Sequence, residues 1–123
     1  MRVTGFDHVV LVVADVERSL AWYCGELGLA GERVDEWRRG EVLFPSVRID
    51  GHTLIDLLSG ERGTANVDHV CLVIEPVDLG ALAASGRFDV VAGPTAGLFG
   101  ARGLAESLYV RDPDGNTVEL RSY

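Results

Sequence analysis

The sequence predicts an α+β fold built from two copies of one small module, each a strand, a helix and three further strands. Three observations support this prediction. The chain has 123 residues, which is the usual length of a single domain. A segment near its start is repeated about halfway along, and the same order of strand-type and helix-type apolar spacing follows each copy. The single domain, residues 1–123, therefore divides into a first module of about residues 1–60 and a second of about 66–123.

The repeat is clearest at the start of each module. Phe6–Val13 reads FDHVVLVV and Val67–Ile74 reads VDHVCLVI, with five of eight positions identical and an offset of 61 residues. Near the ends of the modules, Leu54–Leu57 matches Thr117–Leu120. Matches that recur in the same order indicate an internal duplication.

The helices and strands of the first module are predicted from the spacing of apolar residues and from the residues that begin or end each element. An apolar strand over Val3–Ala14 ends at Asp15, whose carboxylate is suited to cap a helix. Apolar residues then recur at helical spacing as far as Leu27, and Gly28 predicts the end of the helix. Three strands are predicted to follow, over Arg33–Trp37, Val42–Ile49 and Thr53–Leu58.

The second module has a similar pattern. A strand over Val67–Ile74 precedes Pro76 and a short helix with Leu79, Leu82 and Ala83 on its apolar face. Gly93–Ala105 is rich in glycine and poor in strand formers, which predicts a mobile loop. The three remaining strands are predicted over Phe88–Ala92, Ser107–Arg111 and Thr117–Arg121.

Composition narrows the class of partner. A net charge of −8 argues against nucleic acid and anionic membranes, which attract basic surfaces. The longest apolar run is too short for a signal peptide or a membrane span. Cys24 and Cys71 lack metal or redox spacing, so we expect reduced thiols and a cytoplasmic protein.

Two histidines and two carboxylates lie at equivalent places in the repeat. His8 corresponds to His69, and Asp56 corresponds to Glu119. These residues interrupt apolar strands, where an ionised carboxylate requires a partner. If the two modules pack around a pseudo-twofold axis, the four side chains converge and suit Mn, Fe, Co, Ni or Zn. The alternative is that each histidine is a hydrogen-bonded core residue.

Strand alternation places the neighbouring aspartates, Asp7 and Asp68, on the opposite face from the histidines. They are interpreted as groups at the strand edge or as partners that support the ligands. His52 follows Asp50-Gly51 in a predicted turn, which favours an exposed side chain over a ligand.

The segment Asp112-Pro113-Asp114-Gly115-Asn116 is typical of a hairpin turn with a left-handed glycine. This turn pairs Tyr109 with Glu119 on one face, where the phenol is able to contact a substrate or transfer a proton. The alternative is that Tyr109 only packs across the strands.

Arg48 and Arg111 occupy matching places and are candidates to bind an anionic substrate in a forked geometry. Surface salt bridges are the alternative for either arginine.

The motifs together resemble the vicinal oxygen chelate superfamily, which includes glyoxalase I, extradiol dioxygenases and the fosfomycin- and bleomycin-resistance proteins. The resemblance covers essentially the whole chain and rests on Phe6–Val9, Val67–Val70 and, most specifically, Tyr109–Leu120. It implies paired βαβββ modules that form a cupped mixed β-sheet, the glyoxalase-like fold, with a divalent metal inside the cup. It also implies that short members of this kind form homodimers.

The resemblance implies a role for each candidate residue. His8, His69 and Glu119 match the family's metal ligands, and Asp56 stands where glyoxalase I-like members usually have glutamate. With Asp56 the site is an N2O2 centre; without it, the site is a two-histidine, one-carboxylate set. Ser107 and Tyr109 match residues near the substrate, and Glu119 and Tyr109 are the candidate catalytic groups.

The implied function is that of a metal-dependent enzyme, of lyase or isomerase type or dioxygenase-like, that chelates a small substrate with neighbouring oxygens. The alternative is a metal-free, bleomycin-resistance-like dimer that sequesters a small molecule. Replacement of His69 with alanine distinguishes them, because only the enzyme depends on a metal ligand.

Overall fold

A computed structural model describes residues 1–111, 113 and 115–123. The chain forms two compact units: the terminal unit, Met1–His8 with His69–Tyr123, and the middle unit, Val9–Asp68. Strand β1 (Val3–Val13) supplies residues to both.

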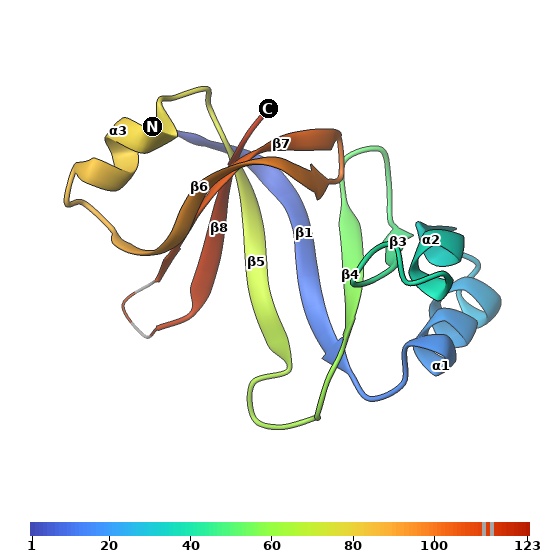
Figure 1. Cartoon of the computed structure of the whole chain (residues 1–123). Coiled ribbons are helices and arrows are strands. Elements are labelled where there is room, and N and C mark those ends of the chain that lie inside the picture. Colours follow the sequence, from blue (N-terminus) through green and yellow to red (C-terminus); the bar gives the residue numbers. More distant parts are fainter. Residues whose placement is uncertain (112, 114) are drawn as a thin grey trace. The chain divides into compact units, whose positions relative to one another are not determined.

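The terminal unit contains the strand order β1–β5–β8–β7–β6, with a short helix α3 (Leu79–Ala84) (Figure 1). Strand β5 (Val67–Ile74) runs parallel to β8 (Thr117–Ser122), whereas β8, β7 (Gly103–Arg111) and β6 (Asp89–Gly100) are successively antiparallel. Its core is formed by six buried side chains from α3 and the strands: Ile74, Leu79, Leu82, Leu108, Val110 and Leu120.

The middle unit begins with the helical segment predicted after Asp15. The Asp15 carboxylate accepts a hydrogen bond from the backbone N–H of Arg18 at 3.0 Å, which confirms the predicted cap. The segment comprises α1 (Val16–Leu20) and a π-helical turn, η1 (Ala21–Glu26). The strand order is β2–β3–β4–β1, with β2 at Ala30–Glu32, β3 at Ser46–Arg48 and β4 at Leu54–Ser59.

The prediction of a strand over Arg33–Trp37 is wrong. Residues Val34–Arg38 form a short helix, α2, preceded by Arg33 in a left-handed conformation (φ 57°). Val34 and Trp37 both pack against the core of the middle unit, and their spacing of three residues is helical. The next predicted strand, Val42–Ile49, is shorter than expected and is confined to Ser46–Arg48.

The prediction of a mobile loop over Gly93–Ala105 is also wrong. This segment forms the end of β6 and the start of β7, which pair as an antiparallel hairpin. The pairing contains register shifts, and Gly93 and Gly97 both have positive φ. A side chain at Gly93 would lie within 2.7 Å of the Ser107 carbonyl oxygen. The glycines therefore mark irregular positions and close backbone approach within a strand.

The pairing expected beyond this hairpin is confirmed. Tyr109 lies opposite Glu119, and Arg111 lies opposite Thr117. Gly115 has φ +86°, as the turn sequence predicts. Asp112 and Asp114, which belong to the same predicted turn, lie outside the described residues.

The fold class is the predicted α+β type with mixed strand pairing. The module boundary between residues 60 and 66 stays a prediction. Both cysteines are free thiols, and Cys71 is completely buried. Within the described part of the chain, no helix is long and apolar enough to cross a membrane.

Candidate metal centre

Three predicted ligands, His8, His69 and Glu119, come together within the terminal unit. They come from three strands, β1, β5 and β8. Glu119 Oε2 lies 3.2 Å from His8 Nε2 and 3.1 Å from His69 Nε2, and the two Nε2 atoms are 3.4 Å apart. The repeat therefore brings its two histidines to one point, beside the carboxylate at the end of the second module.

The spacing of these three atoms fits a divalent transition metal. Metal bonds of about 2.0–2.2 Å at angles between square and tetrahedral place neighbouring ligand atoms about 3.0–3.5 Å apart. Glu119 Oε2 is buried and has no aligned hydrogen-bond partner. A buried carboxylate oxygen of this kind requires a partner that replaces its lost contact with water. A cation shared with the two imidazoles would supply it.

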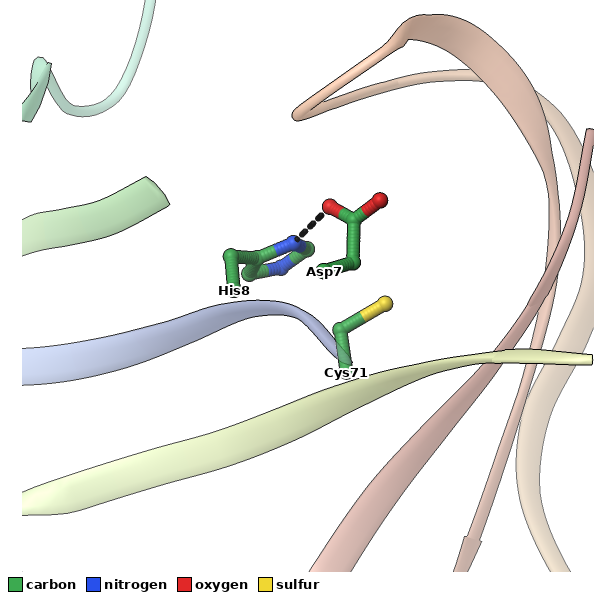
Figure 2. Close-up of side chains that lie close together, drawn as sticks. All are labelled: Asp7, His8 and Cys71. Atoms are coloured by element: carbon green, nitrogen blue, oxygen red, sulfur yellow. Dashed lines mark hydrogen bonds and ion pairs between the residues drawn. The ribbon is translucent and has the colours of Figure 1, made fainter. Parts of the chain in front are cut away.

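Asp7 orients His8 through the other ring nitrogen. His8 Nδ1–H donates to Asp7 Oδ1 at 2.7 Å, and Figure 2 shows this carboxylate directed at the ring. Since a carboxylate only accepts, Nδ1 carries a proton, and Nε2 would present its lone pair to a cation once the ring is neutral. This is the usual way in which proteins fix a metal-binding histidine. Asp7 thus supports the candidate ligand His8, although strand alternation predicts that the two side chains point to opposite faces.

Cys71 lies beside His8 on the adjacent strand (Figure 2). Burial raises the pKa of the thiol to about 12, in spite of the nearby imidazole. The thiol is therefore neutral near pH 7. Asp7, His8 and Cys71 form a second group of potential ligand atoms within 4.8 Å of one another, in which a cation would have to displace the thiol proton, because the thiolate is the effective ligand.

Glu119 is itself held by its second oxygen. Oε1 accepts a hydrogen bond from the Ser107 hydroxyl at 2.6 Å and another from Arg121 Nη1 at 3.3 Å. Arg121 is fully buried and was not singled out from the sequence. The sequence signal for Arg121 is its position two residues after Glu119, which places its cationic side chain on the same face of the strand as the candidate ligand.

The charges around the centre shift the pKa values of its members. Burial lowers the pKa of His8, but its contacts with Asp7, Cys71 and Glu119 outweigh this and raise it to about 12. Burial raises the pKa of Glu119, but His69, His8 and Ser107 hold it below its usual 4.5. The metal-free centre therefore contains an imidazolium between two carboxylates, and a divalent cation would displace its proton.

The metal-free protein is expected to lose stability as the pH rises above about 6.5. The folded-state pKa of His8 lies above the unfolded value. The stabilisation is therefore complete below the unfolded pKa and declines by about 1.4 kcal/mol per pH unit above it. Thermal melting of chelator-treated protein between about pH 6.5 and 9 measures this slope. A flat profile, or an equal slope in His8→Gln, would contradict the assignment.

The remaining predicted residues of this unit lie as follows. Tyr109 is half-buried on β7, and its ring meets that of His69 edge-to-face at 5.4 Å between centroids. Ser107 is fully buried and donates to Glu119, so its hydroxyl is committed to the carboxylate. Arg111 is exposed and lies 3.7 Å from Asp89.

Three other candidates belong to the middle unit. Asp56 is buried on β4 and accepts a hydrogen bond from the Ser46 hydroxyl at 2.5 Å. Arg48 on β3 pairs with Glu32. The assignments of Asp56 as a ligand and of Arg48 and Arg111 as anion-binding residues stay predictions. His52 is exposed in a turn, as expected, and its backbone N–H donates to Asp50.

The family follows from comparison with known proteins. The model of the Glyoxalase/Bleomycin resistance protein/Dioxygenase superfamily matches residues 5–120. The chain belongs to this superfamily. The match includes His8, His69 and Glu119, and it confirms the resemblance that the repeated motifs indicate.

One protein is similar to this chain in sequence, and two solved structures are similar to it in fold. The virulence protein STM3117 of Salmonella typhimurium is 28% identical over 127 residues, covering 100% of this chain and 87% of that protein. The Mn(II)-bound glyoxalase of Novosphingobium aromaticivorans has a TM-score of 0.74 at 22% identity, covering 98% of this chain and 39% of that one. Methylmalonyl-CoA epimerase of Mycobacterium tuberculosis has a TM-score of 0.63 at 21% identity, with coverages of 98% and 88%. The two structures establish the shared glyoxalase-like fold.

Proposed function

We propose that this superfamily member is a metal-dependent enzyme of lyase or isomerase type that binds a small substrate through two neighbouring oxygens. One observation supports it above all others. Three potential ligand atoms lie within 3.4 Å of one another, and the carboxylate oxygen among them is buried without an aligned hydrogen bond.

His8, His69 and Glu119 would hold the cation. With three protein ligands, coordination positions remain for the substrate, as in catalytic rather than structural metal sites. The bound cation would supply Lewis acidity to the two substrate oxygens. The lowered pKa of Glu119 favours a role as an anionic ligand over a role as proton acceptor. The solved Mn(II)-bound glyoxalase with a similar fold makes manganese the first cation to test.

Tyr109 is the proposed proton donor. Burial and the nearby Glu119 carboxylate raise the pKa of its phenol, so the hydroxyl stays protonated at neutral pH. Its ring stands against His69, beside the proposed metal position. A neutral phenol there is able to donate a hydrogen bond or a proton to a substrate oxygen as negative charge develops on it.

Tyr109→Phe is expected to lower kcat by about 10²–10⁴-fold, the usual contribution of a general acid or base. The phenylalanine ring keeps the edge-to-face contact with His69, so cation affinity should fall much less than kcat. Steady-state kinetics and calorimetric titration with Mn²⁺ measure the two effects separately. Unchanged kcat would remove Tyr109 from the mechanism.

The proposed function is tested by reconstitution. Chelator-treated protein is loaded separately with Mn²⁺, Fe²⁺, Co²⁺, Ni²⁺ and Zn²⁺, and the metal retained is counted by elemental analysis. Each form is then incubated in D₂O with a panel of small 2-hydroxy and 2-oxo carbonyl compounds. NMR should show isomerisation, or deuterium entry at the carbon that bears the hydroxyl group of a 2-hydroxy carbonyl compound. Failure to retain one equivalent of any cation would overturn the proposal.

A further inference from the structure

We propose that Arg121 is a positioning residue, whose buried guanidinium sets the orientation of the carboxylates that bind or support the metal. The proposal rests on the function proposed above. Arg121 lies on β8, two residues beyond Glu119, and none of its surface is exposed. Because an arginine stays protonated, a permanent positive charge is buried next to the candidate ligands.

The guanidinium contacts two separate parts of the terminal unit. Nη1 donates to Glu119 Oε1 and to Ser107 Oγ, both at 3.3 Å. Nη2 donates to the carbonyl oxygens of Leu98 at 2.5 Å and Gly103 at 2.7 Å. Nη1 of the guanidinium thus holds the carboxylate of the candidate ligand, and Nη2 is fixed to the backbone of the β6–β7 hairpin.

Arg121 also faces the carboxylate that orients His8. Its Nε lies 3.8 Å from Asp7 Oδ2, and its Cζ lies over the Tyr123 ring, 4.8 Å from the ring centroid. The Tyr123 hydroxyl donates to the same Asp7 oxygen at 2.5 Å. The positively charged guanidinium of Arg121 therefore lies between two carboxylates. Asp7 orients the candidate ligand His8, and Glu119 is itself a candidate ligand.

This arrangement decides which oxygen of Glu119 faces the histidines. Oε1 is occupied by Ser107 and Arg121, so Oε2 is the atom left toward the two Nε2 atoms. A lysine would keep the charge but not the planar, multiply directed donors. Loss of the guanidinium hydrogen bonds should allow the Glu119 carboxylate to rotate, which would weaken metal binding.

Gly100 provides an independent way to move the guanidinium. A Cβ at this position would overlap Arg121 Cζ, Nε and Nη2. Gly100 is absent from the residues with positive φ, so alanine is compatible with its backbone. Gly100→Ala therefore displaces the guanidinium while every ligand and Arg121 itself are retained. Gly51→Ala is the matched control, because a Cβ there meets no atom within 4 Å.

The test uses Co²⁺ as the probe, with wild type, Arg121→Lys, Gly100→Ala and Gly51→Ala. Calorimetry gives the affinity, the visible absorption of bound Co²⁺ reports the coordination, and thermal melting of the metal-free protein reports the fold. Arg121→Lys and Gly100→Ala should bind Co²⁺ about 10–100-fold more weakly, as expected when a partner of a metal ligand is altered. Their Co²⁺ spectra should differ from wild type, and Gly51→Ala should match wild type.

A purely structural role for Arg121 predicts a different result. In that case Arg121→Lys and Gly100→Ala would melt at lower temperature while the affinity and the Co²⁺ spectrum stayed those of wild type, and this would overturn the proposal. If wild-type protein itself bound no Co²⁺, the proposed function would fail first. The two failures are therefore distinguishable, and Gly100→Ala keeps the test decisive if Arg121→Lys does not fold.

Discussion

Replacing His69 with alanine is expected to weaken cation binding by more than about a hundredfold, because loss of a ligand exceeds the 10–100-fold cost of altering a ligand's partner. The change removes one of the three converging atoms, and the side chain is partly exposed, at 13%. The fold should therefore persist. Calorimetric titration with Mn²⁺ and elemental analysis of the purified protein measure the effect.

His52→Ala is the matched control for this variant. His52 is the third histidine of the chain, and it is exposed in a turn of the middle unit. Its replacement should leave both cation affinity and activity unchanged. If His69→Ala retained wild-type affinity, the cation would bind elsewhere. If it also retained binding of a small apolar ligand without metal, the sequestering alternative would be favoured.

The sequence predicts that His8 and His69 come together, and it does so through its repeat rather than through any local motif. The 61-residue offset identified His8 and His69 as a pair, and hairpin geometry placed Tyr109 opposite Glu119. Both predictions depend on strand alternation and strand pairing, which short-range patterns specify well. The same reasoning failed at Val34–Arg38, where the two residues that pack against the core, Val34 and Trp37, have helical spacing.

The groups that support the ligands were less accessible to sequence reasoning. Asp7 accepts a hydrogen bond from the backbone N–H of Ala101, and Arg121 binds the carbonyls of Leu98 and Gly103. These backbone partners lie within Gly93–Ala105, the part of the β6–β7 hairpin for which the sequence predicts a mobile loop. Contacts between a side chain and a distant backbone leave no periodic signal, so only the folded chain reveals them.

The duplication places two aspartates at equivalent positions, and the structure buries them to different extents. Asp7 and Asp68 precede the two histidines at matching positions, and the sequence treats them alike. In the structure Asp7 has no exposed surface, whereas Asp68 is exposed. Because the two aspartates differ in burial, matched substitutions at these positions should have different effects.

Asp7→Ala is expected to lower the free energy of unfolding by about 3–5 kcal/mol, the cost of removing one partner from a buried charge pair. The Asp7 carboxylate accepts from His8 Nδ1 at 2.7 Å, from the backbone N–H of Ala101 at 2.9 Å and from the Tyr123 hydroxyl at 2.5 Å. All three lose this acceptor, and Arg121 loses one of its neighbouring anions. Urea denaturation of the metal-free protein measures the change.

The same substitution should weaken cation binding by about 10–100-fold, because His8 loses the carboxylate that fixes its ring and its tautomer. Asp68→Ala, at the exposed equivalent position, should alter stability by no more than about 0.5 kcal/mol and leave the affinity unchanged. Equal effects of the two substitutions would mean that both modules orient their histidines through the preceding aspartate. A large loss for Asp7→Ala alone would show that the buried aspartate of the first module contributes more to its histidine than the exposed aspartate of the second module does.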